Sequence, residues 1–242
     1  MRINDNMYVL KIPSIINSRE FIYLTLISNN NKLLLIDTGF PGQLKEIKKA
    51  VEDEGFKFDN LEAVVLTHQD IDHVGSLKNI IDELPHVKVL SSGVEAEYIN
   101  GSKTPAKVAY LESNLNNLSH EAKDIYEKFK KFYNCNKINI DVALNEGDSI
   151  NGFDNITVID TSGHTPGHIS LYVNDSKTLI AGDAFIVKDD KLCLTNAALN
   201  FDEEMYINSL KKISDYDINQ VICYHGGFYK ENVNENIKKL IQ

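Results

Sequence analysis

The chain has 242 residues, of which 43% are hydrophobic and 25% charged, as in ordinary folded proteins with a sizeable core. Its formal net charge of −10 argues against a nucleic-acid partner, because phosphate binding needs clustered Lys and Arg. The N-terminus shows no signal peptide, and no apolar run is long enough to span a membrane. Cys135, Cys193 and Cys223 are widely separated and form no Cys-x-x-Cys pair. We therefore expect a cytoplasmic protein with reduced thiols and no membrane partner.

Strand-like and helix-like segments alternate along the chain. Residues 21–27 and 32–39 predict a hairpin across three asparagines, and a helical pattern from residue 44 ends near Gly55. A strand at 61–66 precedes a second helix that extends to about residue 84. The later expected elements are strands at 87–90, 156–159, 169–173, 178–181 and 220–224, a hairpin around 189–190, and helices at 203–213 and 233–240. This alternation predicts a single domain, residues 1–242, with helices packed outside central sheets.

Residues 94–134 interrupt this alternation, because they carry no strand pattern. Thr104 and Pro105 form a typical helix start, with Thr as the N-cap and Pro in the first helical position. We expect a helical insertion between the sheet halves. Between Lys103 and Lys137 there are seven lysines and four acidic residues. A solvated helix face is the simpler interpretation of this excess, and attraction for an anionic substrate is the alternative.

The densest group of polar residues lies in the segment from Thr67 to Leu77. His68, Asp70, Asp72 and His73 fall within six consecutive positions directly after an apolar strand. Charged groups cannot be buried without partners, and apolar residues flank these four on both sides. A mixture of imidazole and carboxylate suits zinc, iron or manganese, so the segment predicts a metal site.

Three later motifs supply further ligand types. Residues 163–168 read Gly-His-Thr-Pro-Gly-His, which contains His164 and His168, and two apolar runs end in Asp183 and His225. Together with the segment from Thr67 to Leu77, these motifs contain five of the seven histidines. The other two are His86 and His120, which have no comparable neighbours.

In this order and spacing, the motifs resemble those of the metallo-β-lactamase superfamily. The resemblance runs from about residue 20 to 227 and includes the strand-to-turn sequence Leu-Leu-Ile-Asp-Thr-Gly at 34–39. It implies an α/β (α+β) fold, a four-layer αββα sandwich with the helical insertion at about 94–134. In that superfamily such insertions commonly cover the active site and select the substrate, which makes Tyr110, Tyr126 and Phe129 candidate substrate contacts.

The resemblance also implies a site for two divalent transition metals. One metal would be held by His68, Asp70 and His164, the second by Asp72, His73 and His225, and Asp183 would bridge both. Asp72 and Asp183 are the carboxylates assigned to the catalytic centre. His168 is expected to orient or pack against the ligands, and Asp37 to be a structural turn and hydrogen-bonding residue near the site.

Each residue alone has another interpretation. Asp72 could cap the helix that follows it, Asp183 could accept hydrogen bonds in a turn, and His225 could be a core histidine. Asp70 stands where most hydrolases of the superfamily carry His, and it could point away from the site. If Asp70 is a ligand, its oxygen favours iron or manganese more than an imidazole would, although zinc remains the expected metal.

The implied activity is hydrolysis of a small ester, thioester or lactone by a metal-bound hydroxide. The expected partner is a small-molecule substrate, with an anionic one as an option, and the sequence does not indicate an oligomeric state. Two alternatives stay open. One is a diiron oxidoreductase that reduces oxygen or nitric oxide, and the other is a non-catalytic, metal-stabilised binding or sensor protein.

Overall fold

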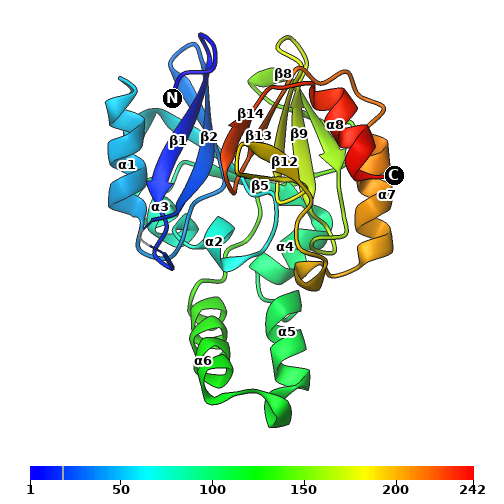
Figure 1. Ribbon diagram of the computed structural model, residues 1–242. Coiled ribbons are helices and arrows are strands. Elements are labelled where there is room, and N and C mark those ends of the chain that lie inside the picture. Colours follow the sequence, from blue (N-terminus) through cyan, green and yellow to red (C-terminus); the bar gives the residue numbers. More distant parts are fainter. Residues whose placement is uncertain (18) are drawn as a thin grey trace.

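Two six-stranded sheets face each other in the computed structural model, which describes residues 1–17 and 19–242 (Figure 1). The first sheet has the order β1-β2-β3-β4-β5-β6. Its strands are β1 (Met7–Pro13), β2 (Phe21–Asn29), β3 (Lys32–Ile36), β4 (Leu61–Val65), β5 (Lys88–Ser92) and β6 (Val142–Leu144). The pairs from β1 to β3 are antiparallel and those from β3 to β6 are parallel.

The second sheet has the order β14-β13-β10-β9-β8-β7. Its strands are β7 (Ser149–Ile150), β8 (Phe153–Asp160), β9 (Ile169–Val173), β10 (Thr178–Gly182), β13 (Gln220–Cys223) and β14 (Gly227–Tyr229). Only β10 and β13 run parallel among these pairs. A separate hairpin pairs β11 (Ile186–Lys188) with β12 (Lys191–Cys193), as the sequence predicted.

Helices cover the outer face of each sheet, and this completes the four layers. On the first sheet lie α1 (Leu44–Asp53), α3 (Leu77–Glu83) and α4 (Gly93–Ile99), whose Ile47, Ile80 and Ile99 join one buried cluster with the strands. On the second lie α7 (Glu203–Ile213) and α8 (Val233–Leu240), through Leu210 and Ile237. A third cluster fills the space between the sheets. The predicted αββα sandwich is confirmed.

The structure differs from the predicted elements near the polar segment. The expected second helix is two short helices, α2 (Ile71–Val74) and α3. The break falls at Gly75, where a Cβ atom would lie 2.3 Å from the backbone of Phe40 and Pro41. A side chain cannot fit there, so the turn lets the segment after β3 pass close to the metal-ligand loop.

The helical insertion lies between β5 and β6 of the first sheet, which corrects the expectation that it separates the two sheet halves. Its first helix, α4, belongs to the sandwich. Only α5 (Ala106–Ser113) and α6 (His120–Cys135) project from it side by side (Figure 1). Helix α5 starts one residue later than predicted, with Pro105 as its N-cap.

In the part of the chain that the structure describes, three short 3-10 helices lie in connections: η1 (Phe58–Asn60), η2 (Leu115–Asn117) and η3 (Ala197–Leu199). Within residues 1–17 and 19–242, no helix combines the length and apolar character that crossing a membrane requires.

Candidate metal centre

The predicted ligands come together at one end of the sandwich. Strands β4, β10 and β13 all end there, and so does β8 before it turns into β9. The segments that follow these strands, including α2, carry the side chains of His68, Asp70, Asp72, His73, His164, Asp183 and His225. The insertion helices project from the same end, below α2 in Figure 1.

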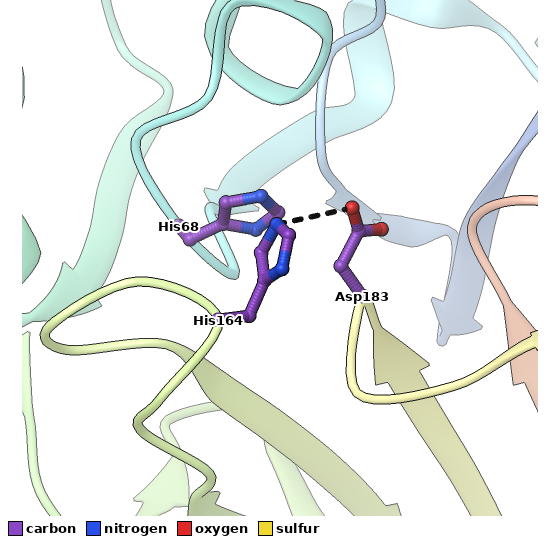
Figure 2. A group of neighbouring side chains, drawn as sticks. All are labelled: His68, His164 and Asp183. Carbon is purple, nitrogen blue, oxygen red and sulfur yellow. Dashed lines mark ion pairs between the residues drawn. The ribbon is translucent and has the colours of Figure 1, made fainter. Parts of the chain in front are cut away.

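Six of the seven side chains form two compact groups. In the first group, one ligand atom each from His68, His164 and Asp183 lies within 4.8 Å of the others (Figure 2). In the second, Asp72, His73 and His225 meet the same limit.

Asp183 lies between the two groups. Its Oδ2 is 3.4 Å from His164 Nε2 and 3.5 Å from His225 Nε2, and its Oδ1 is 3.4 Å from His73 Nε2. One carboxylate thus contacts histidines of both groups. The alternative role, a turn residue whose carboxylate accepts only local hydrogen bonds, does not match these contacts.

Asp70 points into the first group. Its Oδ2 lies 3.2 Å from His68 Nε2 and 3.3 Å from His164 Nε2. It occupies the N-cap position of α2, but its side chain makes no capping hydrogen bond. Asp72 lies in the first turn of α2 and not at its cap. The capping interpretation of Asp72 is therefore wrong, and Asp70 does not point away from the site.

Lys107 is a member of this site that the sequence did not single out. It lies in the first turn of α5, and its Nζ forms an ion pair with Asp70 Oδ2. Burial alone would raise the pKa of Asp70, but Lys107 and the two neighbouring imidazoles hold it well below its usual value. The lysine excess of the insertion was a usable signal, although it does not indicate which lysine turns inward.

Three polar atoms in the centre lack a hydrogen-bond partner among the described residues although they are buried. They are His68 Nε2, His73 Nε2 and Asp183 Oδ1. Leaving such atoms unsatisfied costs about 1–3 kcal/mol each, so their grouping around a common point calls for a ligand.

The electrostatics of the centre also favour a cation. Burial lowers the pKa of His225, yet Asp183 and Asp72 beside it raise it to about 10. Three carboxylates in one buried place thus attract positive charge strongly. Imidazole nitrogens and carboxylate oxygens are the donors that divalent transition metals take, so these residues fit the implied metals.

The outer nitrogens of two ligand histidines are held by oxygen acceptors. His73 Nδ1 lies 2.9 Å from Asp37 Oδ2, and Asp37 Oδ1 accepts a 2.8 Å hydrogen bond from the backbone N–H of Thr67. His164 Nδ1 lies 2.9 Å from Asn200 Oδ1. Each Nδ1 therefore carries the proton, which leaves the Nε2 lone pair free for a metal.

His168 supports the centre without facing it. Its Nε2 accepts a 3.0 Å hydrogen bond from the backbone N–H of Asp183, and its Nδ1 lies 2.8 Å from Thr161 Oγ1. Gly182 has φ +55°, and a Cβ there would lie 2.7 Å from His168 Nε2. With both ring nitrogens engaged, His168 orients the turn that presents Asp183.

The remaining candidates lie apart from the centre. His86 Nε2 lies 3.0 Å from the Leu61 carbonyl, and the exposed His120 pairs with Asp124 on its own helix. Cys223 is buried in the apolar core, where burial raises its thiol pKa.

Glu95, also missed from the sequence, joins the loop that carries His68 to the loop that carries His164. It is fully buried at the start of α4. Its Oε2 accepts hydrogen bonds from the backbone and side chain of Gln69, and its Oε1 accepts from Thr165 Oγ1 and Gly167 N, at 2.7–3.0 Å. Burial raises the pKa of Glu95 to about 7, and these hydrogen bonds oppose the rise.

We expect Glu95→Gln to destabilise the protein and weaken metal retention. The amide would turn a donor toward groups that also donate, at a cost of about 2–4 kcal/mol in the free energy of unfolding. Urea unfolding and competition with a chelator measure the two effects. Glu97→Gln is the matched control, because Glu97 is an exposed residue of the same helix. Equal stability and metal retention in both variants would refute the role of Glu95.

The family is shown by sequence comparison. The model of the metallo-beta-lactamase superfamily matches residues 18–225, and the chain belongs to this superfamily. The probable metallo-hydrolase YflN of Bacillus subtilis (strain 168) is 32% identical over 70% of this chain and 62% of its own length. A hydroxyacylglutathione hydrolase of Photorhabdus laumondii is 26% identical over 90% of this chain and 65% of its own. The chain therefore spans about three fifths of these relatives' length.

The fold has solved counterparts. The metallo-beta-lactamase family protein TTHA1429 from Thermus thermophilus matches with a TM-score of 0.77 at 19% identity, over 99% of this chain and 79% of that chain. The archaeal superfamily protein ST1585 from Sulfolobus tokodaii matches with a TM-score of 0.64 at 18% identity, over 98% and 84%. At 19% and 18% identity, these likenesses show that the fold is shared.

Proposed function

We propose that this protein is a dinuclear metal-dependent hydrolase that cleaves a small ester, thioester or lactone. The observation that carries the proposal is the arrangement of two ligand groups on either side of Asp183, with three buried atoms left unsatisfied. Zinc is the metal we expect, and the carboxylate of Asp70 keeps iron or manganese open.

The residues of the site have different roles in the proposed reaction. Metals bound there would polarise the substrate carbonyl and lower the pKa of water so that hydroxide attacks near neutral pH. Asp183 and Asp72 place their carboxylates among the histidines of both groups. Asp37 and Asn200 fix two histidines in the metal-binding tautomer. No serine or cysteine nucleophile is needed in this scheme.

One relative supports the thioester among the substrate classes that the sequence implied. The Photorhabdus relative is named a hydroxyacylglutathione hydrolase, and hydrolysis of a thioester uses the same carbonyl chemistry as hydrolysis of an ester or lactone. The substrate itself is not fixed by that likeness, because the chain spans only part of that protein.

The test joins metal analysis with a substrate panel. Protein purified without added metal is analysed by elemental analysis, loaded with zinc, iron(II) or manganese(II), and assayed on esters, thioesters, lactones, phosphodiesters and β-lactams. We expect close to two metals per chain and turnover of a carbonyl substrate. If the protein with two metals hydrolyses no substrate of the panel, the proposal is contradicted and a binding or sensor role is favoured. Iron with a visible absorption band and electron uptake favours the oxidoreductase.

A further inference from the structure

A cavity of about 810 Å³ opens beside the first ligand group. The insertion contributes Tyr110 and Leu111 of α5 and Phe129 of α6 to its lining, and the segment after β12 contributes Leu199 and Phe201. Lys107 and His164 also line it, so the cavity reaches the metal centre. Its volume lies in the usual range for small-molecule sites. Tyr126, the third aromatic candidate of the insertion, instead bonds Glu112 between the helices.

The walls of this cavity present apolar side chains to solvent. Tyr110 is 69% exposed, Phe201 57% and Leu199 50%. They come from two separate segments of the chain and line the same space. Burying apolar surface is favourable, so an apolar ligand that covers these side chains gains binding energy.

The charged side chain of the cavity lies at its inner end, next to the metal centre. Among the described residues that line it, none is acidic and Lys107 is the one lysine or arginine, in a chain of net charge −10. Lys107 lies against Asp70, which itself contacts His68 and His164. A ligand that fits has its polar, electron-rich group at the metal centre and its apolar part toward the solvent end.

We propose that this cavity binds the apolar acyl chain of the substrate, with Lys107 beside the oxygen of its carbonyl group. The inference rests on the proposed function and narrows it to esters or thioesters of apolar carboxylic acids. Hydrolysis forms a bond from the acyl carbon to the water oxygen and breaks its bond to the leaving oxygen or sulfur. The leaving group takes one proton from the water, and the other is released to solvent as the acid ionises. The product in the cavity is then a carboxylate with its charge next to Lys107.

Binding of the product acids tests the cavity without relying on turnover. Calorimetric titration of the metal-loaded protein with acetate, butanoate, hexanoate and octanoate should give an affinity that rises about three- to fourfold for each buried methylene. The same trend is expected in kcat/KM for acyl thioesters of these acids. Affinity and kcat/KM that do not change with chain length would overturn the cavity proposal even where hydrolysis is seen.

Three variants locate the two ends of the ligand. Leu199→Asn should flatten the dependence on chain length, whereas Ile125→Asn should not, because Ile125 is similarly exposed but lies outside the cavity. Lys107→Met should weaken octanoate and butanoate binding by the same factor, about tenfold. If Ile125→Asn and Leu199→Asn behave alike, or Lys107→Met binds normally, the assignment is wrong. Chain-length-dependent binding without hydrolysis of any ester would retain the cavity proposal and reject the proposed function.

Discussion

Asp183→Ala is expected to lose both metals and to lower kcat/KM by more than about a thousandfold, because the metals supply several kcal/mol of transition-state stabilisation. The reason is geometric. Asp183 contacts His73 through one oxygen and both His164 and His225 through the other, so each ligand group loses a carboxylate when it is removed. Elemental analysis after metal loading and dialysis should give less than one metal per chain, against two in the unaltered protein.

Variants that change one ligand group, or neither, are compared with Asp183→Ala. His225→Ala removes a ligand from the second group alone, so the first metal should be retained. His86→Ala and His120→Ala should leave the metal content unchanged, because both residues lie outside the centre. If the Asp183→Ala variant still holds two metals, the carboxylate of Asp183 is not a ligand shared by the two groups.

Local patterns were enough to predict most of the fold. The hairpin from β2 to β3, helix α1 and helices α7 and α8 lie close to their predicted positions, because each has a clear period or turn sequence. Strand β1 was not predicted. Its first four residues are all buried, so no polar alternation marks them as a strand. Its pairing with β2 over seven residues depends on a tertiary partner, which local sequence does not identify.

The candidate ligands were also visible in the sequence, because they follow strand ends in a known order. Their supporting contacts were not. Glu95 bonds Gln69 and Gly167, which lie 26 and 72 positions away. Lys107 reaches Asp70 across 37 positions. A local sequence pattern cannot predict contacts between residues so far apart in the chain, because such contacts depend on the tertiary fold.

The insertion is joined to the ligand loop by more than Lys107. Gln69 lies between His68 and Asp70, and its side-chain oxygen accepts a 2.9 Å hydrogen bond from the backbone N–H of Ala106 in α5. Its carbonyl accepts a 2.9 Å bond from Tyr133 Oη of α6. Both projecting helices therefore hold one residue of the ligand loop, so the walls of the cavity and the metal centre are fixed relative to each other.

Asp70→His is expected to shift metal preference toward zinc by at least about tenfold relative to iron(II) and manganese(II). Asp70 places an anionic oxygen 3.2 Å and 3.3 Å from the Nε2 atoms of His68 and His164, where an imidazole would add a softer nitrogen. The substitution removes the negative charge that pairs with Lys107 and that we expect to bind a metal. Competition titrations of both proteins with the three metals measure the shift.

Lys107→Met separates the two consequences of that substitution. It also breaks the ion pair with Asp70 but leaves the carboxylate in place, so affinity for all three metals should rise while their order stays unchanged. A change in order in Lys107→Met like that in Asp70→His would mean that the lysine sets the preference. Identical selectivity in Asp70→His and the unaltered protein would mean that Asp70 binds no metal. In that case its carboxylate serves to hold Lys107 at the inner end of the cavity.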